Sequence, residues 1–305
     1  LDSCLAESLA EIKNGEKKNR GIELGKQAAQ AILQDRANDG SEQNPIVQIP
    51  VSNVPGVYQV VPPFDFQFAP FWENVKLFSL QSKNQFRPAP SPEFNTPEYT
   101  EAFNEVKEYG ALNSTVRTQN QTDYAKFWYE FSEAGWNRIA RVVTHDQELN
   151  LFEAARLFAL VDMAMADAYT AGWDAKNYYN FWRPYTAIRG AANDGNDNTV
   201  ADAAWEPLMP TPPVQDYPST HSALGNAAGT VLAKLLGDNT SFVFESPTAF
   251  PVYSSRGYTS FSKAAQENAD SRVRAGIHFR FACNAGLQLG GKIGKWTVDN
   301  YLRKL

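Results

Sequence analysis

The chain has 305 residues, 43% of them hydrophobic and 20% charged, so it can bury a sizeable core in one large domain or two small ones. Its net charge of −6 provides no global basic field, which argues against a nucleic-acid partner. Cys4 and Cys283 form neither a metal-ligand spacing nor a disulfide framework. The most apolar stretch, residues 157–169, contains Asp162 and Asp167 and is too short for a membrane span.

The first third of the chain divides into a helical and an irregular part. Residues 1–38 are predicted to be helical, because apolar residues recur mostly at three- and four-residue spacing. Residues 40–97 are rich in proline and aromatic residues without a clear period, so we expect an ordered, irregular arm that wraps the helices. Within this arm, Arg87-Pro88 has no lysine seven residues upstream and is interpreted as a turn.

Helices are expected to resume at about Glu98, and a long one should run from residue 121 to 143. Thr144-His-Asp-Gln147 matches a capping box, in which the threonine hydroxyl and the glutamine side chain bind exposed backbone amides. The next helix should therefore run from there towards Lys176. His145 lies in this cap and is interpreted as a solvated residue.

The last third is predicted to alternate between one long loop and three helices. Residues 191–213 are rich in Asn, Asp, Gly and Pro and should form a loop. Helices are expected over about 219–236, 259–274 and 279–302. Alternating strand patterns are scarce throughout, so the sequence predicts a mostly α fold.

Lys176 and Arg183 are the first pair of residues that suggest a site. They lie seven residues apart, close to two helical turns, so both side chains are expected to leave one helix from the same face. Pro184 disfavours helical geometry at Arg183, which predicts that the helix ends there and lets the guanidinium swing over its end. Trp173, one turn before Lys176, is expected on the same face.

Pro218-Ser-Thr-His221 is predicted to open a helix, with the proline in its first turn. The amides of Ser219, Thr220 and His221 would then be unpaired donors at the positive end of the helix dipole, an arrangement that binds anions. The Ser219 hydroxyl adds a donor. His221 can face the same anion and move a proton.

Ser271-Arg272 and His278 form the third segment. On one helix Arg272 and His278 would point from different faces, but Gly276 predicts a helix end, after which the chain can present His278 from a new segment. A lone segment of this kind is weak evidence. Together, the three segments hold two of the chain's three histidines.

Two arginine guanidiniums and a lysine ammonium from these segments could neutralise a multiply charged oxyanion. The sequence therefore predicts a shared oxyanion site within residues 173–278. We expect one helical domain over residues 1–305, with the N-terminal helices and arm in 1–97 and a helical bundle in 98–305.

At these residues the chain resembles the vanadium-dependent haloperoxidases and the related type 2 phosphatidic acid phosphatase superfamily. Their shared signature is Lys-x6-Arg-Pro, Pro-Ser-Gly-His and Ser-Arg-x5-His. Residues 113–117 and 173–176 are similar to soluble bacterial haloperoxidase-type members. The chain starts at Leu1 rather than Met, which suggests that an upstream segment such as a signal peptide was removed. We therefore expect a periplasmic or secreted bacterial protein, without a membrane span and able to form a homo-oligomer.

The resemblance implies vanadate as the cofactor, in a site that phosphate can also occupy. His278 would ligate the vanadium or attack phosphorus, and His221 would be the acid–base histidine. Lys176 would also be catalytic, by polarising bound peroxide. The oxygens of the oxyanion would be held by Lys176, Arg183, Ser219, Thr220 and Arg272.

Two positions depart from the family pattern. Thr220 stands where the family has glycine, and its side chain is expected to narrow the pocket. Val214 stands seven residues before His221, where haloperoxidases commonly carry Phe or His. Trp173 and Val214 are the expected pocket residues.

The favoured function is a vanadium-dependent haloperoxidase that oxidises halide with hydrogen peroxide. Three features favour it: Trp173 beside Lys176, the long region before the first segment, and the lack of the membrane helices typical of lipid phosphatases. The alternatives are an acid phosphatase that hydrolyses phosphomonoesters through a phosphohistidine, and a catalytically idle anion-binding scaffold. Asp162, Asp167 and Asp174 are candidates to orient a site arginine.

Overall fold

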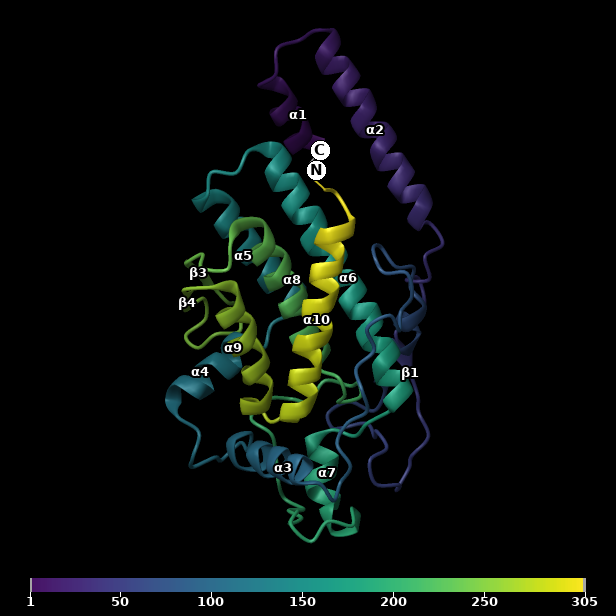
Figure 1. Cartoon of the computed structure of the whole chain (residues 1–305), viewed down its shortest axis with the longest axis vertical. Coiled ribbons are helices and arrows are strands. Elements are labelled where there is room, and N and C mark those ends of the chain that lie inside the picture. The colour runs from purple at the N-terminus through teal and green to yellow at the C-terminus, as the bar shows by residue number, and fades with distance from the viewer. Residues whose placement is uncertain (1, 304–305) are drawn as a thin grey trace. The chain divides into compact units, whose positions relative to one another are not determined.

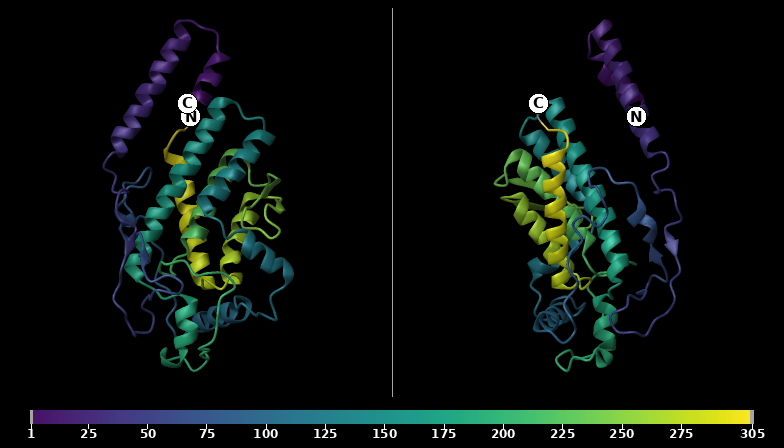
Figure 2. Two further views of the ribbon diagram at one scale, coloured as in Figure 1. Left: turned by 180° about the vertical axis from the view of Figure 1, so that it is seen from behind. Right: turned by 45° about the vertical axis from the view of Figure 1, so that its right-hand side comes forward.

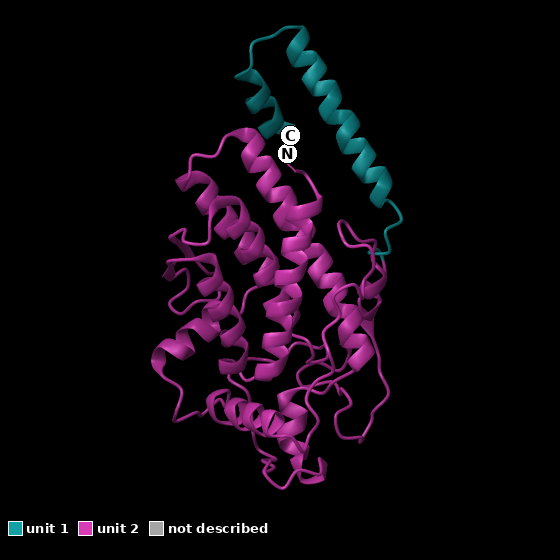
Figure 3. Ribbon diagram, in the orientation of Figure 1, with its two compact units in different colours: residues 1–42 teal, residues 43–305 magenta. Residues whose placement is uncertain are grey.

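The chain is described by a computed structural model that covers residues 2–303, so Leu1, the basis for the expected processing, lies outside the described residues. It is mostly helical, as predicted (Figure 1). Two compact units divide it, residues 1–42 and residues 43–305 (Figure 3). Among the described residues, no helix combines the length and the apolar character that a bilayer span requires.

The first unit holds two helices, α1 (Asp2–Ala10) and α2 (Glu16–Arg36). The expected helical character of residues 1–38 is confirmed, with a break between the two helices that ends at Gly15. Lys18 supports the break, because its ammonium donates to the carbonyl of Ile12 beyond the end of α1. Neither helix buries a residue.

The arm that follows is irregular, as predicted. It contains one short antiparallel ladder, β1 (Ile46–Val47) with β2 (Gln67–Phe68), and the 3-10 helix η1 (Pro70–Asn74). The arm is attached to the bundle through Asp167, whose carboxylate accepts the amides of Ser79 at 2.6 Å and Leu80 at 2.8 Å. Charge-assisted bonds of this kind are stronger than neutral ones and hold the arm against the long helix that carries Asp167.

The next helices are α3 (Pro97–Tyr109), α4 (Gln119–Phe127) and α5 (Ser132–Asp146). The prediction of one helix over residues 121–143 is wrong, because the chain turns between α4 and α5. This turn stacks Trp128 on Trp136, with ring centroids 5.9 Å apart, and both side chains are buried. Burial of two large aromatic rings outweighs the local preference for a continuous helix.

The long helix α6 (Leu151–Tyr179) does not start at the expected capping box. Thr144 lies in the last turn of α5, and the box that starts α6 is formed by Asn150 and Glu153. The Asn150 side chain accepts the Glu153 amide at 3.1 Å, and the Glu153 carboxylate accepts the Asn150 amide at 3.2 Å. His145 is exposed, as predicted.

The bundle is completed by α7 (Pro184–Gly190), the 3-10 helix η2 (Ala191–Asn193), α8 (Thr220–Leu236), α9 (Phe261–Arg274) and α10 (Arg280–Asn300). The three predicted C-terminal helices are therefore confirmed to within a few residues. Helices α6, α8 and α10 pack side by side, and their contact buries the main core (Figures 1 and 2).

One hairpin escaped prediction: β3 (Phe242–Glu245) pairs with β4 (Ser255–Tyr258). Its first strand alternates buried and exposed residues, and Phe242 and Phe244 join the core. A four-residue alternation is too short to stand out in a sequence that is otherwise helical.

Candidate oxyanion site

Lys176 and Arg183 converge, but by a route that differs from the prediction. Helix α6 ends at Tyr179, and Asn180 adopts a left-handed conformation with φ of 46°. Arg183 therefore leaves from the N-cap of α7, whose first residue is Pro184, rather than from the face of α6 that carries Lys176. The expectation that both side chains share one helix face is wrong, because the turn at Asn180 redirects the chain.

The Lys176 ammonium is enclosed by backbone oxygens. It donates to the carbonyl of Gln215 and, at 3.2 Å, to that of Asp216. Burial lowers the pKa of Lys176 well below its ordinary value, and the nearby Arg183 guanidinium lowers it further. The two carbonyls direct the ammonium towards the segment that precedes α8.

Arg183 is held by three contacts. Its Nε donates to the carbonyl of Val214 at 2.6 Å, and its Nη1 donates to the carbonyl of Ile277 at 2.6 Å. The same Nη1 lies 2.9 Å from Nε2 of His278. Arg183 thus links the segment before α8 to the segment before α10, which brings the first and third predicted segments together.

The start of α8 corrects a second expectation. Ser219 is the N-cap and its hydroxyl accepts the Ser222 amide at 3.3 Å, so Pro218 precedes the helix instead of lying in its first turn. The Ser219 amide donates to the carbonyl of Ala282 at 2.9 Å and is therefore not a free donor. The amides of Thr220 and His221 remain in the first turn, where a helix offers them no carbonyl.

Thr220, at the position where the family signature has glycine, packs against α6. A Cβ added to Gly172 would lie 2.3 Å from Cγ2 of Thr220, so the threonine methyl fills the space that the glycine leaves. Gly172 lies one turn before Lys176 on the same helix face. The methyl is therefore accommodated at the helix–helix contact.

The end of α9 confirms the predicted turn at Gly276. This residue has φ of 79°, and its amide donates to the carbonyl of Val273 at 3.0 Å. The Ile277 amide donates to the carbonyl of Arg272 at 3.1 Å, which completes a Schellman motif. The turn presents His278 from a new segment, as expected.

Arg272 comes from the last full turn of α9 and is buried. Its Nη1 donates to the carbonyl of Trp128 at 3.3 Å, and its guanidinium lies 5.6 Å from the ring centroid of Tyr129. Its Nε is buried and has no hydrogen-bond partner within the described part of the chain. Burial lowers the pKa of Arg272 to about 10.

His221 lies beside Arg272 on the first turn of α8. Burial of its ring lowers the pKa well below 6.5, and the Arg272 charge lowers it further. The Asn268 side chain fixes the backbone here, because its Nδ2 donates to the His221 carbonyl at 3.3 Å. Nε2 of His221 is buried without a hydrogen-bond partner among residues 2–303.

Asp216 is the site residue that the sequence did not reveal. Its side chain is 0% exposed, and its Oδ1 lies 2.9 Å from Nδ1 of His278 and 3.7 Å from Nη1 of Arg183. Burial raises the pKa of this carboxyl to about 7, against the opposing effect of Arg183 and Lys176. The one feature of the sequence that could have revealed it is the position of this carboxylate, two residues before the Pro218-Ser-Thr-His221 segment.

Asp162, Asp167 and Asp174, the aspartates proposed to orient a site arginine, bind other partners. Asp174 pairs with Arg87 at 2.7 Å from Nε to Oδ2, and the turn expected at Arg87-Pro88 lies just before it, at residues 83–86. Asp162 accepts a bond from Asn137 at 2.8 Å, and Asp167 binds the arm. That expectation is therefore wrong: the carboxylate near a site arginine is Asp216.

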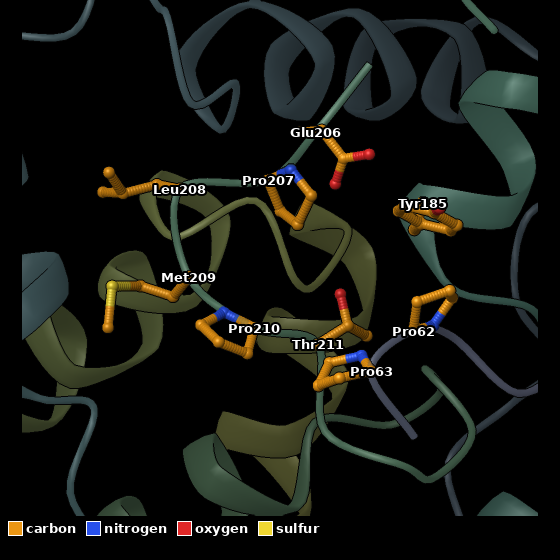
Figure 4. Close-up of a pocket in the computed structure, with 9 residues that line it drawn as sticks. All are labelled: Pro62, Pro63, Tyr185, Glu206, Pro207, Leu208, Met209, Pro210 and Thr211. Atoms are coloured by element: carbon orange, nitrogen blue, oxygen red, sulfur yellow. The ribbon is translucent and has the colours of Figure 1, made fainter. Parts of the chain in front are cut away.

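Trp173 and Val214 are both buried. The ring of Trp173 stacks on Tyr169 with centroids 4.2 Å apart, and Val214 contributes the carbonyl that binds Arg183. Their role as pocket residues stays a prediction. Neither belongs to the lining of the hollow next to the site, which is formed by Pro62, Pro63, Tyr185, Glu206, Pro207, Leu208, Met209, Pro210 and Thr211 (Figure 4).

This hollow has a volume of about 280 Å³. Its Met209 wall is anchored at the end of α9, where the Met209 amide donates to the carbonyl of Ala275 at 3.1 Å. The hydroxyl of Thr211 points into the space and is buried without a hydrogen-bond partner in the described chain (Figure 4). Thr211 lies three residues before Val214, so the hollow adjoins a segment that holds Arg183.

The side chains of the site carry a net positive charge. Lys176, Arg183 and Arg272 are 1%, 1% and 3% exposed, and among residues 2–303 the one carboxylate within 4.0 Å of any of them is Asp216, beside Arg183. Buried charges without partners are costly, so this arrangement is suited to an anion. The fold and these contacts define a helical-bundle protein with a buried cationic site.

Comparison with known proteins supports the same class. Residues 156–305 match the family model for the VCPO second helical-bundle domain. The chain is 30% identical over 308 residues to the vanadium chloroperoxidase of Curvularia inaequalis, an alignment that covers 80% of this chain and 50% of that protein. Over residues 156–305, the chain is therefore similar to this helical-bundle domain. It spans about half the length of the curated relative.

Solved structures agree. The crystal structure of the first bacterial vanadium-dependent iodoperoxidase superposes with a TM-score of 0.70 at 30% identity, covering 82% of this chain and 62% of that one. The apo-type bacterial vanadium-dependent chloroperoxidase gives a TM-score of 0.71 at 17% identity, covering 90% and 72%. The second likeness shows the fold alone.

Proposed function

We propose that this protein is a vanadium-dependent haloperoxidase, which oxidises halide with hydrogen peroxide. The observation that carries the proposal is the buried excess of positive charge formed by Lys176, Arg183 and Arg272, which the single buried carboxylate of Asp216 offsets only in part. Burial lowers the pKa of each of these three groups, which means that the protein interior destabilises their charged forms. The negative charge of a bound oxyanion would stabilise these charged forms.

The residues present fit vanadate. Buried polar atoms without partners in the described chain, Nε of Arg272 and Nε2 of His221, are available to a new ligand. The Ser219 hydroxyl accepts two bonds from Ser222, at 3.3 and 3.0 Å, and keeps its own hydrogen to donate. His278 would bind the metal through Nε2, and the oxygens would be held by Lys176, Arg183, Ser219, Thr220 and Arg272. Phosphate, also a tetrahedral oxyanion, could occupy the same place.

When bound, vanadate would supply a Lewis acid that activates peroxide towards halide. The protein supplies charge and proton transfer around it. Because the pKa of His221 is lowered, its ring is neutral near pH 7, so Nε2 can accept a proton and return it. Lys176 and the arginines act in a buried, water-poor environment, where each charge has a larger effect than it would in water.

The test is to load the protein with orthovanadate and to measure peroxide-dependent oxidation of iodide and bromide. We expect turnover that requires vanadate and is lost in His278→Ala. Gln288→Ala, an exposed position on α10, is the matched control and should keep full activity. An active H278A variant, or turnover without vanadate, would contradict the proposal.

Phosphomonoester hydrolysis by the vanadate-free protein is measured in parallel. Hydrolysis that vanadate inhibits, without any halide oxidation, would assign the protein to the acid phosphatases instead. Tight binding of vanadate or phosphate with neither activity would identify an idle anion-binding scaffold.

A further inference from the structure

The inference concerns the pair formed by Asp216 and His278. Asp216 lies in the short segment before α8, and its backbone is held at both ends. Its amide donates to the carbonyl of Phe181 at 2.9 Å, and its carbonyl accepts a bond from Lys176 at 3.2 Å. The buried side chain is thereby aimed at the imidazole of His278, with Oδ1 2.9 Å from Nδ1.

The surroundings of His278 determine where its ring carries a proton. Nε2 lies 2.9 Å from Nη1 of Arg183, and a guanidinium has only donors. Nε2 must therefore accept, which leaves the proton of the neutral ring on Nδ1. Oδ1 of Asp216 lies 2.9 Å from Nδ1, without the angle of a hydrogen bond, and neither atom has a hydrogen-bond partner among the described residues.

We propose that Asp216 is the positioning residue of His278: its carboxylate keeps the proton on Nδ1, so that Nε2 keeps the lone pair that now faces Arg183 and would bind the vanadium in its place. Histidines that ligate metals usually donate their other ring nitrogen to a carboxylate, carbonyl or water, which fixes the tautomer and raises the basicity of the ligand. The inference takes the identity of the oxyanion, vanadate, from the proposed function. The tautomer of His278 does not depend on that function.

A different role for Asp216 makes the opposite prediction. If it served only as a counter-charge for Lys176 and Arg183, its negative charge would repel a bound oxyanion. Removing it would then tighten anion binding. If it positions His278, removing it loosens the ring and weakens binding. The sign of the change in vanadate affinity separates the two roles.

The experiment uses the full chain labelled with 15N-histidine, together with the variants Asp216→Ala and Asp216→Asn. The chain has three histidines, so the ring-nitrogen NMR spectrum is simple to assign. We expect the wild-type His278 signals to show a protonated Nδ1 and an unprotonated Nε2. In D216A, the ring should lose its fixed orientation towards Arg183, so the Nε2-protonated form should become populated beside the Nδ1-protonated form.

Vanadate affinity is then measured by titration of the same proteins. We expect D216A to bind about 10- to 100-fold more weakly than wild type, as for other losses of a supporting carboxylate. D216N keeps an oxygen acceptor without the charge and should fall between D216A and wild type. Asp162→Asn, at an exposed position on α6, is the control and should leave both tautomer and affinity unchanged.

Wild-type His278 protonated at Nε2 would overturn the inference, as would tighter vanadate binding by D216A or D216N. If D216A fails to fold, D216N decides alone, through the same tautomer and affinity measurements. If the wild type binds no vanadate, the proposed function fails by itself. The tautomer, and affinity for inorganic phosphate, then still test the role of Asp216.

Discussion

Thr220 shows how one residue depends on a partner far away in the chain. Its methyl occupies the space beside Gly172, where an added Cβ would lie 2.3 Å from Cγ2. A larger residue at either position must displace the other, because packed interiors leave few voids. The departure from the family's glycine is thus matched by a glycine on α6.

This pairing predicts that the effect of Gly172→Ala on the free energy of unfolding depends on the residue at position 220. Gly172→Ala alone should lower the free energy of unfolding by about 1–3 kcal/mol, because the clash outweighs the better helix propensity of alanine. In a Thr220→Ser background, which lacks the methyl, the same change should be neutral or stabilising by up to about 1 kcal/mol. Urea unfolding of the four proteins in a double-mutant cycle measures the coupling. Additive effects would show that the two residues do not compete for the space.

His221 predicts how the stability of the vanadate-free protein depends on pH. The folded state resists protonation of this ring, whereas the unfolded state takes up a proton below about 6.5. The unfolded state therefore binds more protons, and stability falls as pH drops through 6.5, by up to about 1.4 kcal/mol per pH unit.

His221→Gln removes this proton uptake, so its unfolding free energy should fall less steeply than that of wild type between pH 6 and pH 5. The measurement is urea unfolding of both proteins at pH 5, 6, 7 and 8. All other titrating groups are common to the two proteins, so the difference isolates His221. Parallel pH profiles would contradict the lowered pKa.

At the scale of elements, helix ends were harder to predict than helix interiors. Thr144-x-x-Gln147 and Asn150-x-x-Glu153 both match a capping box, and only the second starts a helix. The first lies in the last turn of α5, where the chain is still helical. The two patterns look equally good in the sequence. Packing decides between them, because Leu149, next to the cap residue Asn150, contacts the core.

The cap itself can be tested. Asn150→Ala should lower the free energy of unfolding by about 1 kcal/mol, because the amides of Phe152 and Glu153 lose their acceptor. Vanadate affinity should stay within two-fold of wild type, since the cap lies at the end of α6 remote in sequence from Lys176. Gln288→Ala is the control for a change on an exposed helix surface. No loss of stability in N150A would mean that water replaces the cap without cost.

At the scale of the whole molecule, all the predicted site residues belong to the unit that begins at residue 43. Helices α1 and α2 bury no residue and expose large apolar side chains such as Leu24 and Leu33. The core that carries the site is formed mainly by residues of α4, α5, α6, α8, α9 and α10. The integrity of the site should therefore depend on residues 43–305.

Deleting residues 1–42 tests this division. We expect the shortened protein to fold cooperatively and to bind vanadate within about two-fold of the full chain, because the site residues and the helices that carry them all lie in residues 43–305. Circular dichroism on heating and vanadate titration are the measurements. Loss of cooperative unfolding, or a ten-fold loss of affinity, would show that the first unit supports the bundle.

Local signals in the sequence were sufficient for much of this protein. The apolar period located α8, α9 and α10, Gly276 predicted the turn that presents His278, and three short segments supplied the cationic residues. Each of these signals acts over a few residues: a helical period, a backbone angle that glycine tolerates, or a proline that ends a helix. A single chain therefore reveals them.

Other features required the tertiary structure. The early end of α6, the approach of Asp216 to His278 and the match of Thr220 with Gly172 all join residues that are distant along the chain. Their free energies come from burial, close packing and charge pairing, which depend on what surrounds a residue in space. Neighbours in sequence carry no record of those surroundings, so only the folded chain decides them.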